Sequence, residues 1–95
     1  MYDQLSISQI KLESSRLNFD KRAVDTLSIL IEKTITIINS KNKKQNSSTL
    51  LENIYNLISI LNTIHQYREE QQKSIFLIIQ SEFVDLLQAI GPNDI

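Results

Sequence analysis

The sequence predicts an all-α protein: a helical bundle built on an antiparallel helical hairpin and completed by dimerisation. The 95-residue chain has one Gly and one Pro, and these stand together as Gly91-Pro92. Helix interiors reject Gly and Pro most strongly, so nothing before this pair forces a helix to end. Two long segments also repeat their apolar residues at helical spacing. A chain of this length predicts a single all-helical domain, residues 1–95, with a small core.

The first 19 residues are expected to be an N-terminal arm or a short helix. Leu5 and Ile7 alternate like a strand, whereas the apolar residues of the stretch 5–12 also fit two helical turns. We interpret this stretch as a helix. Asp20 follows a polar boundary and is placed to cap the next helix, because Asp side chains accept hydrogen bonds from first-turn amides.

The first helix of the hairpin is predicted over residues 21–39. Most of its apolar residues fall within an arc of about 140°, the width expected of a face that packs on a core. This arc contains Ala23, Val24, Leu27, Leu30, Ile31, Ile35 and Ile38. Residues 40–48 are polar and basic, and they predict the loop that reverses the chain.

The second helix of the hairpin is predicted over residues 50–90. A capping box, Thr49-Leu50-Leu51-Glu52, indicates its start. One apolar arc contains Leu50, Leu51, Ile54, Leu57, Ile58, Leu61, Ile64 and His65, and a later one contains Ile75, Phe76, Ile79, Phe83, Leu86, Leu87 and Ile90. Gly91-Pro92 predicts the end of the helix and leaves residues 91–95 as a tail.

The stretch 66–74 decides whether this second helix is continuous. It is polar, yet it holds good helix formers and neither Gly nor Pro. If an ideal helix is continued across it, the two apolar arcs agree to within about 10°. The match favours one long helix, and a rod of about 60 Å needs a second copy to cover it. If the stretch is a turn, the same residues form a compact bundle of three or four helices.

Few residues of this sequence suggest chemistry. His65 is the sole histidine, and with Arg68 and Gln72 it would form a polar layer that fixes the register of a continuous helix. The chain has no cysteine, no glycine-rich loop and no metal-ligand spacing. We therefore predict no enzyme, no cofactor, no metal and no small-molecule substrate. Phosphotransfer through His65 is the third-ranked hypothesis for function.

Charge is divided between the two halves of the chain. Residues 1–49 carry eight cations against five acids, and residues 50–95 carry two cations against six acids. Opposite signs favour packing of the halves on each other or on a second copy. The net charge of −1 makes nucleic acid an improbable main ligand. Lys21, Arg22 and the basic cluster at 41–44 nevertheless keep a small DNA-binding regulator as the alternative function.

The sequence lacks the patterns typical of export or of a transmembrane segment. Its N-terminus has no basic start followed by a long apolar core. The longest uninterrupted apolar run is residues 75–79, far below the roughly 20 residues that span a bilayer. We expect a cytoplasmic protein. Its many Ile, Asn, Gln and Lys residues suit an AT-rich genome and point to a bacterium or a phage.

Several apolar residues lie outside the core-facing arcs, and these carry the functional prediction. They are Ile29, Ile37, Ile60, Leu77, Ile78 and Val84. Ile29 with Ile37, and Leu77 with Val84, lie along one side of their helices as second narrow strips. Helices with two apolar strips lie inside assemblies or bind a partner. We predict a non-enzymatic protein that acts by protein–protein association, as an adaptor, inhibitor or immunity-type factor, and that self-associates.

In its length, acidic-leaning charge and succession of helices, the chain resembles the small helical-bundle proteins that confer immunity to bacteriocins. The resemblance is one of architecture, which many small regulators and phage proteins share, and it transfers no residue role. It places an immunity-type factor among the predicted functions.

Overall fold

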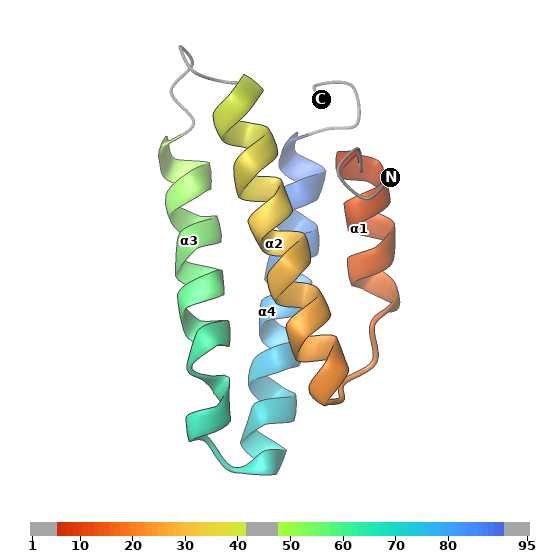
Figure 1. Cartoon of the computed structure of the whole chain (residues 1–95), viewed down its shortest axis with the longest axis vertical. Helices are drawn as coiled ribbons and strands as arrows, with labels where there is room; N and C mark the ends of the chain where they lie inside the picture. Colours follow the sequence, from red (N-terminus) through yellow and green to blue (C-terminus); the bar gives the residue numbers. More distant parts are fainter. Residues whose placement is uncertain (1–5, 42–47, 91–95) are drawn as a thin grey trace.

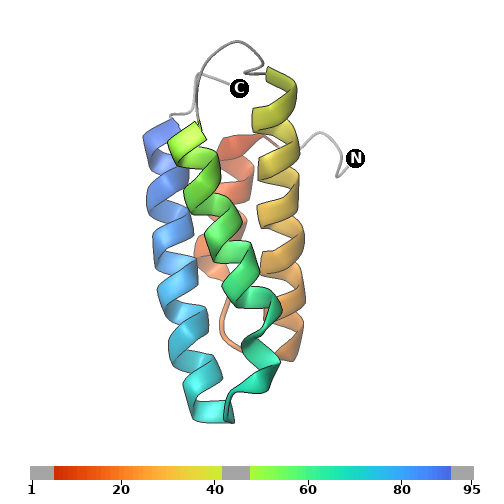
Figure 2. The same cartoon turned by 90° about the vertical axis from the view of Figure 1, so that its left-hand side faces the viewer.

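Four α-helices form an up-and-down bundle in the computed structural model, which describes residues 6–41 and 48–90 (Figure 1). The elements are α1 (Ile7–Arg16), α2 (Lys21–Lys41), α3 (Ser48–Asn62), the short 3-10 helix η2 (Ile64–Gln66) and α4 (Glu69–Ile90). Consecutive α-helices run antiparallel and pack on each other, and α1 closes the ring against α4 (Figure 2). The predicted all-α bundle is therefore confirmed.

The single long helix favoured over residues 50–90 is wrong, because the chain turns back between α3 and α4. The helix tightens at the end of α3, where the amide of Thr63 donates to the carbonyl oxygen of Ile60 at 3.0 Å. The backbone is then extended at Tyr67, with φ −103° and ψ 164°. The reversal at residues 63–68 confirms the alternative of a compact bundle.

The chain reverses because a folded-back chain buries more apolar surface. Phe76 and Phe83 of α4 have no exposed surface, and Ile64 of η2 is also buried. A single rod would leave this face in water, at a cost of about 25 cal/mol per Å². The Cα radius of gyration is 13.1 Å, close to the about 13 Å of a compact 100-residue domain. The rod of about 60 Å that would have needed a second copy to cover it therefore does not form. The agreement in phase between the two apolar arcs is accidental.

One core runs through the bundle, and the predicted arcs supply most of it. The side chains with less than 2% exposure include Ile10, Leu27, Ile31, Ile38, Ile54, Leu61, Phe76, Ile79, Phe83 and Leu87. Other arc residues are half-buried at its edge, namely Val24, Ile35, Leu50, Leu51, Ile75 and Leu86. His65 is the one arc member that is exposed.

Side-chain caps hold the starts of α1 and α2. Asp20 Oδ1 accepts a hydrogen bond from the Ala23 amide at 2.8 Å, which confirms the predicted cap of α2. At α1 the Gln9 amide donates to Ser6 Oγ at 3.2 Å, and the Ser6 amide donates to Gln9 Oε1 at 2.9 Å. This capping box helps to fix the helical alternative for the N-terminal segment, and the Ser-x-x-Gln spacing is a sequence signal that we missed.

Some predicted boundaries shift by one or two residues. α2 continues to Lys41 and α3 begins at Ser48, so the loop expected at 40–48 is shorter at both ends. Thr49 is the second residue of α3 rather than its cap. Residues 42–47 and the predicted stop and tail at 91–95 lie outside the described residues.

Candidate protein-interaction surface

The two flanks of α4 face different neighbours. Gln80 Nε2 donates to the carbonyl oxygen of Ser14 in α1 at 2.7 Å, and Lys73 and Leu77 line a cavity of about 430 Å³ with the α1–α2 connection. The flank that carries these three residues therefore faces α1. The opposite flank of α4 faces α3, the other neighbour of α4 in the bundle. At about 100° per residue, Ile78 lies on this opposite flank, about 145° around the helix from the centre of the buried stripe.

The flanks of α3 can be assigned in the same way. Asn62 lines a cavity with Lys21 and Asp25 of α2, so its flank faces α2. Ile60 lies about 120° to the opposite side of the buried stripe of α3, on the flank that faces α4. Measured along the helix axes from the connection between η2 and α4, Ile60 lies about 11 Å from the end of η2 and Ile78 lies about 13 Å from the start of α4. The two isoleucines therefore border the same seam at a similar height.

These isoleucines belong to an apolar surface that we call the α3–α4 face. Ile78 is 61% exposed and Ile60 is 45% exposed. The face consists of Leu57, Ile60, Ile75, Ile78, Glu82 and Leu86, in which Leu57 is buried and Ile75 and Leu86 are half-buried. Exposed apolar residues that occur singly are ordinary, whereas apolar residues grouped on one seam indicate a binding site.

The margin of the α3–α4 face is acidic. Glu82 and Asp85 are exposed on the α3 side of α4, about 105° and 165° from the buried stripe. Within residues 48–90 the only cations are Arg68 and Lys73. Arg68 lies in the connection that precedes α4, and Lys73 lies on the flank that faces α1. Among the described residues of α3 and α4, the charged side chains beside this face therefore include carboxylates and no cation.

The six apolar residues singled out in the sequence do not gather on one surface. They divide into Ile60 and Ile78 on the α3–α4 face, Leu77 and Val84 on the flank of α4 towards α1, and Ile29 and Ile37 on α2. Ile37 packs against the core and Val84 is half-buried. Each predicted narrow strip thus has one exposed member, whereas Ile60 and Ile78 are both exposed.

The α3–α4 face also contains residues that we had assigned to the core alone. Ile75 and Leu86 fall within the core-facing arc, and Glu82 lies outside it. The signal that could have identified them is their spacing, because residues 75, 78, 82 and 86 follow one flank of a helix. The spacing does not indicate which neighbouring helix that flank contacts.

The predicted polar layer depended on a continuous helix, and the chain reverses between His65 and Gln72. His65 lies in η2 and Arg68 lies in the connection, and both are exposed. Gln72 is half-buried, and its Nε2 donates to the carbonyl oxygen of Tyr67 at 2.9 Å. Gln72 thereby ties the first turn of α4 to the connection, instead of fixing the register of a rod.

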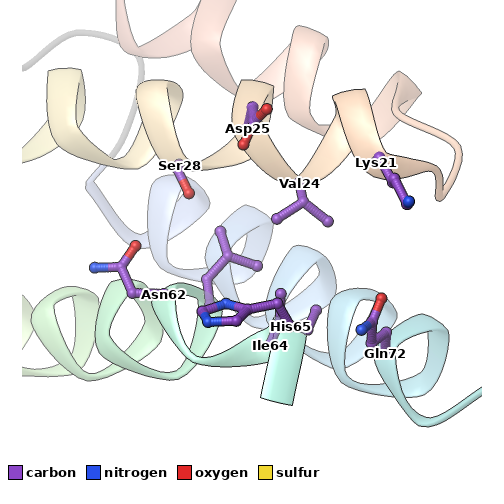
Figure 3. A pocket seen from close by; sticks show the side chains of 9 residues that line it. Lys21, Val24, Asp25, Ser28, Asn62, Ile64, His65 and Gln72 are labelled. Atoms are coloured by element: carbon purple, nitrogen blue, oxygen red, sulfur yellow. The ribbon is translucent and has the colours of Figure 1, made fainter. Parts of the chain in front are cut away.

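A cavity of about 490 Å³ opens between α2 and the connection from α3 to α4 (Figure 3). Its lining consists of Lys21, Val24, Asp25, Ser28, Leu61, Asn62, Ile64, His65 and Gln72. The His65 ring and the Val24 side chain project into it from opposite sides. In the part of the chain that the structure describes, no three His, Asp or Glu side chains are grouped to hold a metal ion. Phosphotransfer through His65 stays a hypothesis.

The basic residues of the DNA-binding hypothesis lie at opposite ends of one helix. Lys21 and Arg22 begin α2 and Lys41 ends it, so about 30 Å of helix separates them. Residues 42–44 lie outside the described residues. Among the described residues, the cations named for that function therefore do not lie close together.

The chain matches no protein-family model, no curated protein and no solved structure. Among the helices of the described residues, none combines the length and the apolar character that crossing a bilayer requires.

Proposed function

We propose that the protein acts by binding another protein through the α3–α4 face and does not catalyse a reaction. The observation that carries the proposal is the exposure of Ile60 and Ile78 on one seam of a bundle whose core is already enclosed. Neither side chain completes the core of the chain. Each leaves apolar surface in water, which association with a partner would remove.

In the predicted self-association, the protein bound by the α3–α4 face is a second copy of the chain. Four helices of one chain enclose the core, so a second copy is not needed to cover the long apolar stripe. We therefore favour a foreign protein as the occupant of the face, and the homodimer stays a prediction. Light scattering over a dilution series tests it directly, because a monomer has a mass of 11.0 kDa.

The proposal is tested by photo-crosslinking in cells that produce the protein. A benzophenone amino acid replaces Ile78 in one variant and Ile29 in another. Ile29 is the matched control because it is 52% exposed but lies on α2, which is diagonal to α4 across the bundle. We expect a cross-linked product from position 78 and none from position 29.

The same experiment identifies the kind of partner. A product of twice the chain mass would show that the partner is a second copy, and any other mass would show a foreign protein. The additional substitution Ile60→Ser should abolish the product, since both isoleucines border the seam. If position 78 gives no product while the variant folds, the α3–α4 face does not bind a protein.

A further inference from the structure

We infer that the segment bound by the α3–α4 face is an amphipathic helix whose apolar stripe is flanked by basic residues. The inference rests on the proposed function and adds the chemistry of the partner. It follows from two independent properties of the face, its shape between two helices and its charge.

The shape of the face suits a helix. α3 and α4 pack side by side and antiparallel (Figure 2), so a segment bound over their seam contacts two helices along its length. Ile60 and Ile78 border this seam from the two sides, and half-buried Ile75 and Leu86 lie closer to its centre. A helix that lies along such a seam presents apolar side chains spaced three or four residues apart. The 15 residues of α3 give the seam a length of about 22 Å, or about four turns of a bound helix.

The charge of the face selects among such helices. Glu82 and Asp85 lie beside Ile78, and the cations Arg68 and Lys73 lie elsewhere. Basic residues along the stripe of a bound helix would meet these carboxylates, and complementary charge both steers binding and fixes its register. Acidic residues at the same positions would face like charge, and like charges close together oppose binding.

The same charge disfavours a second copy as the occupant. In a symmetric dimer the same face of both chains forms the interface, so Glu82 and Asp85 of each chain would approach a face that is itself acidic. Repulsion between them has no counterbalancing cation on the face. A foreign basic helix removes the same apolar surface from water without this repulsion.

Two synthetic peptides test the inference on the full chain. Both carry leucines in one amphipathic pattern over about four turns, and the remaining positions are lysine in one peptide and glutamate in the other. We expect the lysine peptide to bind at least tenfold more tightly than the glutamate peptide. Amide shifts in NMR titrations should concentrate in residues 57–61 and 75–86, the segments that form the face.

Charge reversal on the face provides the decisive variant. Glu82→Lys with Asp85→Lys should reverse the preference, so that the glutamate peptide binds more tightly. The matched control reverses two exposed acids of α2, with Asp25→Lys and Glu32→Lys, and gives the same change in net charge. The control should keep the preference for the lysine peptide. Helicity by circular dichroism confirms that each variant folds.

A second pair of variants separates shape from charge. Ile60→Ser with Ile78→Ser leaves every charge in place and should weaken the lysine peptide at least tenfold. Equal binding of the two peptides, or a preference that the reversal at Glu82 and Asp85 does not change, would overturn the inference about the partner. Unchanged binding after both serine substitutions would overturn it as well, because binding by charge alone needs no apolar contact with Ile60 and Ile78.

Failure of these peptide experiments is distinguishable from failure of the proposed function. A cross-link from position 78 that persists when the lysine peptide shows no preference would keep the face as an interface and reject a basic partner. Absence of the cross-link would reject the interface itself.

Discussion

Gln80 of α4 holds the last turn of α1 through the carbonyl oxygen of Ser14, 2.7 Å from its Nε2. The same Nε2 donates to the carbonyl oxygen of Leu17 at 2.8 Å. The last carbonyl groups of a helix have no partner within the helix, and α1 has only 10 residues, too few for stability alone. The position of α1 therefore depends on a side chain from the far end of the sequence.

Replacing Gln80 should destabilise the bundle. Gln80→Ala removes both hydrogen bonds and leaves the Ser14 carbonyl oxygen with only the longer one from the Leu17 amide, at 3.4 Å. We therefore expect the free energy of unfolding to fall by about 1 to 3 kcal/mol. Urea denaturation followed by circular dichroism measures the change. Gln88→Ala, at an exposed position of the same helix, is the control and should change stability by less than about 0.5 kcal/mol. Equal losses from the two substitutions would contradict the role of Gln80.

Removing the hydroxyl of Ser14 should not destabilise the protein. Ser14 is fully buried, and its Oγ has no hydrogen-bond partner among the residues that the structure describes. Ser14→Ala removes a group whose burial without a partner costs about 1 to 3 kcal/mol. We therefore expect the midpoint of urea unfolding to stay constant or to rise. The bulkier Ser14→Val should cost about 1 to 3 kcal/mol, because α1 packs closely on α4 there. A clear loss of stability in Ser14→Ala would show that the hydroxyl has a partner.

The cap of α2 should be replaceable by another capping residue. Asp20 Oδ1 accepts a hydrogen bond from the Ala23 amide, which has no other partner in the first turn of a helix. Asp20→Ala should lower the free energy of unfolding by about 1 kcal/mol, whereas Asp20→Ser should keep most of it. Thermal unfolding of the two variants under the same conditions compares them. The prediction fails if the serine variant is as unstable as the alanine variant.

Proline substitution tests where α4 begins. The Gln72 amide donates to the carbonyl oxygen of Arg68 at 2.8 Å, so Glu69 is the first helical residue, the position that tolerates proline. Glu69→Pro should change the free energy of unfolding by no more than about 1 kcal/mol. Ser74→Pro, at an exposed position inside α4, should cost about 3 kcal/mol or more. In a continuous helix both substitutions would be equally damaging, and that result would contradict the reversal at residues 63–68.

The candidate surface could be predicted from the sequence only in part. Ile60 and Ile78 fall outside the core-facing arcs by periodicity alone, and both are exposed in the structure. That they share one seam depends on α3 and α4 being antiparallel neighbours. This arrangement follows from the reversal at residues 63–68, which the phase match argued against. Ile75 and Leu86 likewise join the face only because α3 lies on their side of α4.

The sequence by itself determined the helices and their buried faces. Helix propensity, capping residues such as Asp20 and the spacing of apolar residues act within a few turns of chain, so each segment carries its own signal. Only the tertiary structure decided the reversal between α3 and α4. Residues 63–68 contain neither Gly nor Pro, and each of them is compatible with a helix. The chain turns there because Phe76 and Phe83 then pack into a core shared with residues from α1, α2 and α3, and the burial of that surface depends on the whole chain.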